Sequence, residues 1–266
     1  MSESYSAIDV RREHGVDYVT LNRPEVRNAI DDQLIDELTR WADAAAHDRT
    51  LRMAVLGGAG RSFCSGADLA WRSRTVNYDY EQNIHDAWTL ARLFVKLDTL
   101  PVPLIGRVQG AALAGGVGLV AVCDIVVATE DAVFGFTDVK FGLVPAVISP
   151  YAVAKIGASA SRHLFLTGER FSASRAHALG LVHVIAPPDG LDAAIARVAQ
   201  DLRTAGPRAM AATKALIASV MDRPPASVTQ LTVETIADLR ITTEAKEGIR
   251  AFLDKRSPGW IQGDGS

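Results

Sequence analysis

The sequence predicts an α/β protein, and three observations lead to this fold class. Short β-prone segments alternate with helical patterns through the first two thirds of the 266 residues, as a core of largely parallel strands requires. Helical patterns dominate the last third. A hydrophobic fraction of 48% suffices for a buried core and excludes a mainly disordered chain.

The first elements follow from local signals. Two β-prone stretches, 8–12 and 16–21, are joined by Glu13-His14-Gly15 and predict a hairpin. Asp31 or Asp32 then caps a helix that extends to about His47. A second helix is expected over 80–97, and strands are expected over 53–56, 104–108, 125–128 and 133–136.

Beyond Pro150 the pattern becomes helical. Four successive helices are expected over 191–204, 207–221, 228–242 and 244–254. We therefore expect a compact core over residues 1–195, followed by a helical region over 196–266. A helical region in this position often docks on another subunit.

Composition excludes several classes of protein. With 28 basic and 31 acidic residues the net charge is −3, so no basic field indicates a nucleic-acid partner. The longest apolar run, 110–123, is too short to cross a membrane, and residues 1–10 lack a secretory pattern. Cys64 and Cys123 form no disulfide framework, and the six histidines show no metal-binding spacing. We expect a cytoplasmic protein with no metal and no membrane contact.

Two glycine-containing segments could present main-chain amides to a ligand. Residues 61–69 follow a strand and a glycine turn, and free amides beside a helix start can bind an oxyanion. A plain connection with Asp68 as helix cap is the alternative. Residues 110–118 allow close approach of a ligand to the main chain, with one or two helical turns expected over 119–122. Packing of small residues in a crowded core is the alternative there.

A third segment, 134–145, carries one carboxylate among apolar residues. Asp138 is a candidate acid or base because it is expected at the end of a strand in apolar surroundings. It could equally pair with Lys140 or cap a turn.

Together these segments resemble the enoyl-CoA hydratase/isomerase (crotonase) family. The resemblance runs from Leu21-Asn22-Arg23-Pro24 through Asn28-Ala29 to Phe252-Leu253-Asp254-Lys255-Arg256, nearly the whole chain. The methylglutaconyl-CoA hydratase branch is the most similar in Ala67-Asp68-Leu69 with Trp71, in 115–120, in Cys123-Asp124 and in 145–151. The resemblance implies a spiral of ββα units with a C-terminal helical trimerisation region, assembled as homotrimers or dimers of trimers.

The resemblance also implies roles for individual residues. Ala67 and Gly115 match the two amides of an oxyanion hole, which would stabilise a thioester enolate without a metal. No cofactor would be bound permanently, because coenzyme A arrives as part of the acyl-CoA substrate. The positions that would hold it are Val26, Arg27, Ala29, Ser65, Ala67, Asp68, Leu69 and Gly115, with Phe252 and Lys255 reaching it from the C-terminal helix of this or a neighbouring subunit.

Two departures from the family pattern bear on the reaction. The family's first catalytic glutamate is replaced by Gly118, as in the branch named above, and the second by Asp138. Aspartate is one methylene shorter, which moves the carboxylate by roughly 1.5 Å. We expect a hydratase of a short or branched 2-enoyl-CoA in which Asp138 is catalytic with Ala67 and Gly115. The alternatives are an enoyl-CoA isomerase with a single acid/base and a non-catalytic acyl-CoA-binding protein.

Overall fold

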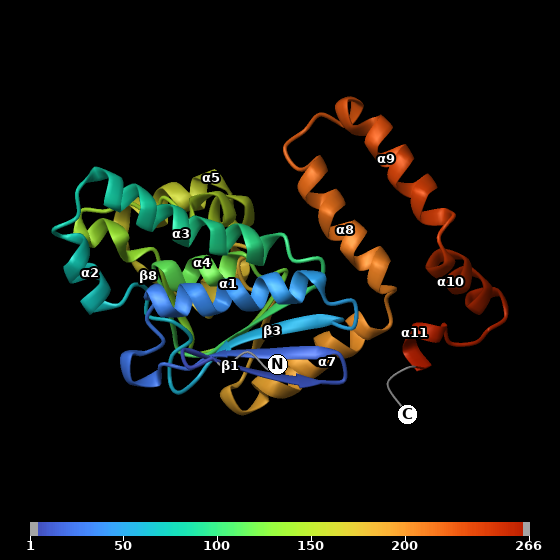
Figure 1. The fold of residues 1–266 in the computed structure, drawn as a ribbon, viewed down its shortest axis with the longest axis horizontal. Coiled ribbons are helices and arrows are strands. Elements are labelled where there is room, and N and C mark those ends of the chain that lie inside the picture. The colour runs from blue at the N-terminus through green and yellow to red at the C-terminus, as the bar shows by residue number, and fades with distance from the viewer. Residues whose placement is uncertain (1–4, 263–266) are drawn as a thin grey trace. The chain divides into compact units, whose positions relative to one another are not determined.

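The computed structural model describes residues 5–262, and the chain divides into two compact units (Figure 1). The first unit extends to Leu100 and resumes from Leu104 to Ile195. The second unit holds Pro101–Pro103 and the described residues from Ala196 onward.

A six-stranded sheet in the order β1-β2-β3-β4-β6-β9 forms the centre of the first unit. Only β1 and β2 are antiparallel, and the other neighbours pair in parallel. A smaller sheet has the order β5-β7-β8. The strands are β1 Ile8–Glu13, β2 Val16–Leu21, β3 Met53–Gly58, β4 Leu104–Val108, β5 Ala111–Leu113, β6 Ile125–Thr129, β7 Val133–Gly135, β8 Arg170–Ser172 and β9 Val184–Ala186.

Local chemistry explains the best-defined elements. The β1–β2 turn uses His14 and Gly15, both at positive φ (47° and 74°), which matches the twist of a tight hairpin. All six residues of β3 are buried, as expected for a strand covered on both faces. The side chain of Asp31 caps α1 by accepting a hydrogen bond from the Leu34 N–H at 2.9 Å.

Helices pack around these sheets (Figure 1), and α1 lies against α3. Asp79 and Gln82 form a capping box at the start of α3. The helices of the first unit are α1 Asp32–His47, α2 Leu69–Thr75, α3 Tyr80–Asp98, α4 Gly115–Ala121, α5 Ser149–Thr167 and α6 Ala173–Ala178, with 3-10 helices η1 Pro24–Val26, η2 Thr137–Phe141 and η3 Pro188–Gly190; α7 Leu191–Arg203 begins there.

The second unit is helical. Glu244 caps the start of α8, because its carboxylate accepts hydrogen bonds from the N–H groups of Arg208 and Ala209 at 2.9 and 2.8 Å. The indole N–H of Trp260 donates to the carbonyl oxygen of Thr204 at 3.1 Å. Beyond the rest of α7, the helices are α8 Pro207–Val220, α9 Pro225–Arg240, α10 Thr243–Leu253 and α11 Gly259–Gln262.

The α/β prediction is confirmed, but one predicted helix starts in the wrong place. The helix expected over 119–122 begins at Gly115, within the glycine-rich segment. Packing explains the difference, since a β-carbon on Gly116 would lie 2.4 Å from the carbonyl oxygen of Cys64. Glycine, a poor helix former, is needed here because another main-chain segment touches the helix.

Several short elements were not anticipated: β5, β8, β9 and α2. The three strands have three residues each, too few for a hydrophobic period to be recognised. Along residues 5–262, no helix combines the length and the apolar character that a membrane crossing requires.

Candidate active site

Two segments far apart in the sequence run side by side at the site. The N–H of Ile30 donates to the carbonyl oxygen of Gly66, and the N–H of Asp68 donates to that of Ile30, both at 2.8 Å. The N–H of Ser65 donates to the carbonyl oxygen of Arg27 at 3.0 Å, and the Ser65 hydroxyl donates to the carbonyl oxygen of Val26. The stretch 26–30 and the stretch 65–68 therefore form one two-stranded edge.

Asn28 fixes this edge from the inside. Its side chain is fully buried, accepts a hydrogen bond from the N–H of Arg23 and donates to the carbonyl oxygens of Ala59 and Ser62. Its positive φ of 55° is one that asparagine tolerates better than most residues. The segment between β2 and α1 and the segment between β3 and α2 are thus tied together by one amide group.

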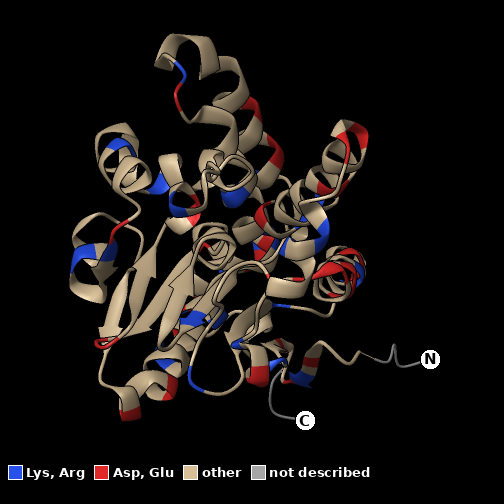
Figure 2. Ribbon diagram, turned by 90° about the vertical axis from the view of Figure 1, so that its left-hand side faces the viewer, with Lys and Arg blue, Asp and Glu red and all other residues tan. Residues whose placement is uncertain are grey.

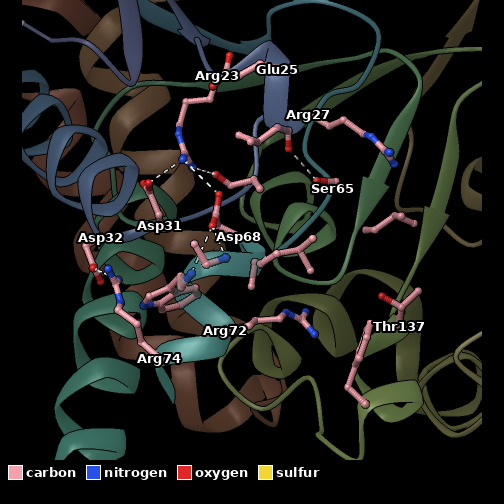
Figure 3. Close-up of a pocket in the computed structure, with 18 of the residues that line it drawn as sticks. Arg23, Glu25, Arg27, Asp31, Asp32, Ser65, Asp68, Arg72, Arg74 and Thr137 are labelled. Carbon is pink, nitrogen blue, oxygen red and sulfur yellow. Dashed lines mark hydrogen bonds and ion pairs between the residues drawn. The ribbon is translucent and has the colours of Figure 1, made fainter. Parts of the chain in front are cut away.

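Arg23 and Asp68 form the charged centre of the same edge (Figure 3). The guanidinium of Arg23 pairs with Asp31 at 2.8 Å and with Asp68 at 3.2 Å, and it donates to the carbonyl oxygen of Ala29. The Asp68 carboxylate also caps α2 by accepting from the N–H groups of Ala70 and Trp71. Burial raises the pKa of Asp68, but these hydrogen bonds and the charge of Arg23 outweigh it, so the net pKa is lowered.

The main-chain segments that carry Ala67 and Gly115 are in contact. A β-carbon on Gly66 would lie 3.1 Å from the β-carbon of Ala114, so the residues that precede the two amides touch. Ile30 lies beside both, because it forms a β-bridge with Ala67, and a β-carbon on Gly115 would lie 2.9 Å from the Cδ1 atom of Ile30. Throughout residues 5–262, no acceptor pairs with the N–H of Ala67 or of Gly115.

The backbone at Ala114 sets the direction in which Gly115 begins α4. Ala114 has φ 46° and ψ −118°, a region that favours glycine, and its N–H is held by the carbonyl oxygen of Gly135 at 2.8 Å. Such a conformation costs on the order of 1–3 kcal/mol and persists where the surroundings impose it. Gly115 is the first residue of α4, so its N–H has no partner within the helix.

Asp138 lies in η2 and is half-buried. Its Oδ2 atom is buried and has no hydrogen-bond partner among the described residues. Burial raises the pKa of Asp138, and a backbone hydrogen bond and the positive charge of Arg72 oppose that rise only in part. The ion pair with Lys140 that the sequence left open does not form.

A pocket of about 1190 Å³ opens along this edge. Seven residues that the sequence singled out for coenzyme A line it: Val26, Arg27, Ala29, Ser65, Ala67, Asp68 and Leu69. Gly115 and Asp138 are not among the lining residues, although Leu113 and Thr137 beside them are. Phe252 and Lys255 belong to the second unit, at the end of α10 and just after it.

Four cations of this pocket have no carboxylate partner among the described residues: Arg27, Arg72, Lys140 and Arg170. By contrast, Arg23 pairs with Asp31 and Asp68, and Arg74 pairs with Asp32. Acidic and basic residues are otherwise interspersed along the ribbon (Figure 2). The excess of positive charge in the pocket suits a polyanionic ligand, although the net charge is negative.

Sequence reasoning missed Arg23 and Arg72 as site residues. Arg23 stands in a motif quoted for the family resemblance, but its two carboxylate partners lie 8 and 45 positions away. Arg72 carries no local signal. Its position follows from α2, which was itself not predicted.

Gly118 is a buried residue of α4, and its neighbours leave no space for a side chain. A β-carbon there would lie 2.3 Å from the Cγ2 atom of Ile148 and 2.9 Å from the Cε1 atom of Phe94. A second carboxylate at this position would displace both neighbours. Of the two positions that the resemblance assigns to catalytic glutamates, Asp138 alone carries an acidic side chain. No metal-binding group of His, Cys, Asp and Glu occurs in the described part of the chain.

Comparisons with known proteins show which fold and family the chain shares with them. The structure of an enoyl-CoA hydratase from Shewanella pealeana superposes with a TM-score of 0.93 at 38% identity, covering 96% of each chain. That of an enoyl-CoA hydratase from Mycobacterium smegmatis gives 0.91 at 31% identity, covering 96% of this chain and 99% of the other. The 2,3-dehydroadipyl-CoA hydratase of Escherichia coli is 32% identical over 254 residues, 95% of this chain and 98% of its own.

These likenesses define an α/β enzyme of the crotonase fold, as the sequence predicted. Residues 11–263 match the enoyl-CoA hydratase/isomerase family, and the chain belongs to it. The predictions of fold class, family and enzymatic nature are confirmed.

Proposed function

We propose that this enzyme is an enoyl-CoA hydratase that adds water across the 2,3 double bond of a short or branched 2-enoyl-CoA thioester. One observation carries the proposal: the N–H groups of Ala67 and Gly115 have no acceptor among the described residues and stand on main-chain segments in mutual contact. Such amides are suited to an oxygen that gains negative charge during a reaction. Membership of the family supports a thioester as the owner of that oxygen.

In this scheme the two amides stabilise the enolate formed from the thioester. Main-chain donors held by the fold need no reorganisation when charge develops, and removal of one typically costs roughly 3–4 kcal/mol of transition-state stabilisation. The contact of Gly66 with Ala114 and the imposed backbone of Ala114 support a fixed geometry for both donors.

Asp138 would serve as the acid/base. Its carboxylate takes a proton from water while the water oxygen bonds to C3 and the electrons of the double bond move to the thioester oxygen. The enolate then collapses, and C2 takes the proton from the Asp138 carboxylic acid, so that one water is added in total. The raised pKa of Asp138 supports this double role, since burial makes the carboxylate a stronger base, and the carboxylic acid formed can return the proton.

The substrate's coenzyme A portion would lie along the edge formed by 26–30 and 65–69. Arg27 would meet its phosphates, and Phe252 with Lys255 would complete the site from the C-terminal helix of this or a neighbouring subunit. Asp68 would act through its main chain, because its carboxylate is occupied by Arg23 and by the cap of α2.

Crotonyl-CoA tests the proposed reaction directly. Hydration removes the conjugated double bond, so we expect loss of the enoyl absorbance and formation of 3-hydroxybutyryl-CoA, identified by mass spectrometry. A protein that binds crotonyl-CoA yet turns over neither it nor longer and branched 2-enoyl thioesters would contradict the proposal and favour the binding-only alternative.

A second candidate, enoyl-CoA isomerase, is favoured by the packing of Gly118. Moving a double bond by proton transfer between C4 and C2 needs one acid/base group and no ordered water, and the space at Gly118 holds no second carboxylate. Incubation with a 3-enoyl-CoA separates the two. Conversion to the 2-enoyl isomer without any 3-hydroxyacyl product would replace hydratase by isomerase.

We further propose a homotrimer or a dimer of trimers built through the helical region. Large apolar side chains on its helices are exposed: Ile217, Met221, Val233, Ile236, Ile241, Ile249, Phe252 and Leu253. Faces of this kind mark surfaces that associate. Light scattering coupled to gel filtration is expected to give three or six times the 28.4 kDa chain mass, and a monomer would refute this assembly.

A further inference from the structure

Arg72 extends from α2 toward η2, and its charge has no counter-ion there. The guanidinium carbon lies 4.3 Å from the centre of the Phe141 ring, a cation–π contact. The Nη1 atom is buried, and no described residue accepts from it. Figure 3 shows the side chain leaving α2 on the side of Thr137, with no dashed line reaching its guanidinium. A buried polar atom without a hydrogen-bond partner costs free energy, although the residue as a whole is only half-buried.

Phe141 connects this guanidinium to Asp138. Both residues belong to η2, three positions apart, and side chains at that spacing lie on the same side of a 3-10 helix. Asp138 also has one buried oxygen, Oδ2, without a partner. The Nη1 atom of Arg72 and the Oδ2 atom of Asp138 therefore lie on the same side of η2, each buried and without a hydrogen-bond partner among the described residues.

We propose that Arg72 is a positioning residue for Asp138: the guanidinium, held on Phe141, supplies a positive charge close enough to favour the carboxylate yet leaves both carboxylate oxygens free of an ion pair. This rests on the role given to Asp138 in the proposed function. A direct ion pair would make the carboxylate a poor base, whereas burial without any cation would keep it protonated. The positive charge of Arg72, near Asp138 but not paired with it, therefore lets the carboxyl group act first as a base and then as an acid.

Other charged groups around η2 do not supply this charge. Lys140 on η2 itself is exposed. The neighbouring helix α5 carries four titratable groups, of which Lys155 donates to the carbonyl oxygen of Cys123 and His163 pairs with Glu169. The other two are Tyr151, which lies against Phe94, and the exposed Arg162. Arg72 is the one side-chain charge that lowers the pKa of Asp138.

The test is a direct titration of Asp138. Protein labelled with carboxyl-¹³C aspartate is titrated by NMR, and the Asp138 signal is assigned by its loss in Asp138→Asn. In Arg72→Met we expect the midpoint to move up by about one pH unit or more, since an opposite charge nearby shifts a carboxyl by that order. Arg72→Lys, which keeps the charge, is expected to restore most of the difference. Arg162→Met, which removes an exposed arginine from α5, is the matched control and is expected to leave the midpoint unchanged.

Kinetics provide a second readout. The acidic limb of the kcat/KM profile for crotonyl-CoA is expected to move upward with the NMR midpoint in Arg72→Met, while the Kd for saturated butyryl-CoA changes less than threefold. An unmoved Asp138 midpoint in folded Arg72→Met overturns the proposal. A large loss of butyryl-CoA affinity with an unmoved limb also overturns it and makes Arg72 a phosphate ligand. Because the titration needs no turnover, a failed hydratase assay would refute the proposed function without deciding the role of Arg72.

Discussion

The guanidinium of Arg23 lies 3.2 Å from the carboxylate of Asp68, although the two residues are 45 positions apart. Asp68 follows Ala67 directly and caps α2, so this pair joins the first loop of the site to the segment that carries one of the free amides. With Asp31 as a second carboxylate partner, the cluster is largely withdrawn from water. Loss of these ion pairs would therefore affect both the stability of the fold and the position of the pocket edge.

Replacing Arg23 by methionine is expected to destabilise the protein by about 3 kcal/mol. The change leaves Asp31 and Asp68 as largely buried carboxylates without their cation, and removing one partner of a buried pair costs roughly 3–5 kcal/mol. Urea unfolding measures the effect. The control is Arg40→Met, which breaks an exposed pair with Asp36 on α1 and is expected to cost about 0.5 kcal/mol or less. Equal losses in the two variants would refute a special role for Arg23.

Asp68 gives the stability a defined dependence on pH. Its folded pKa is lowered, so the stabilisation is fully present above the unfolded value near pH 3.9 and is lost as pH falls through the lower folded pKa. Asp68→Asn keeps a capping oxygen but removes the charge. The difference in unfolding free energy between wild type and this variant is expected to be largest above about pH 4 and to shrink on acidification. A constant difference from pH 7 to pH 2 would contradict the assigned pKa.

Replacing Asp138 by asparagine is expected to lower kcat for crotonyl-CoA by a factor of roughly 10² to 10⁴, the usual contribution of a positioned acid/base. The pocket lining does not include Asp138, so the affinity for butyryl-CoA is expected to stay within about threefold of wild type. Stopped assays for kcat and calorimetry for binding check the two parts. Asp138→Glu serves as the matched variant that keeps a carboxylate, and activity in Asp138→Asn near that of wild type would remove Asp138 from the mechanism.

Replacing Gly118 by alanine is expected to destabilise the fold by about 1–3 kcal/mol through overpacking. The new β-carbon would lie 2.3 Å from the Cγ2 atom of Ile148, well inside normal contact. Gly259→Ala is the control, because the nearest atom to its added carbon is 3.8 Å away, and a change of about 0.5 kcal/mol or less is expected there. Denaturation midpoints decide the matter: an unchanged midpoint for Gly118→Ala would show that the space for a second carboxylate exists after all.

Elements with strong local signals were predictable. The hairpin of β1 and β2 and the helix capped by Asp31 form where the sequence places them, because turn residues, caps and hydrophobic periods act within a few positions. The glycine-rich start of α4 was not predictable in this way. Glycine has a low helix propensity, so the local sequence argues against a helix there. Glycines are needed because Cys64 and Ile148 leave no space for larger side chains.

Among the candidate residues, the sequence singled out most of the pocket edge, from Val26 to Leu69. It did so through a family resemblance, since no local pattern makes Ala67 or Gly115 distinctive. Arg72 remained hidden because its meaning depends on Phe141 and Asp138, which are 66 or more positions away in the chain.

By itself the sequence determined the fold class and the family, and it singled out Asp138 as the candidate acid/base, because these depend on residue type, order and short-range spacing. The tertiary structure alone decided which main-chain amides stay without partners, which cation stands near Asp138 and why Gly118 admits no side chain. Those properties arise from packing and burial between distant segments, where the cost of an unpaired polar group or a displaced atom is set by neighbours that local sequence does not reveal.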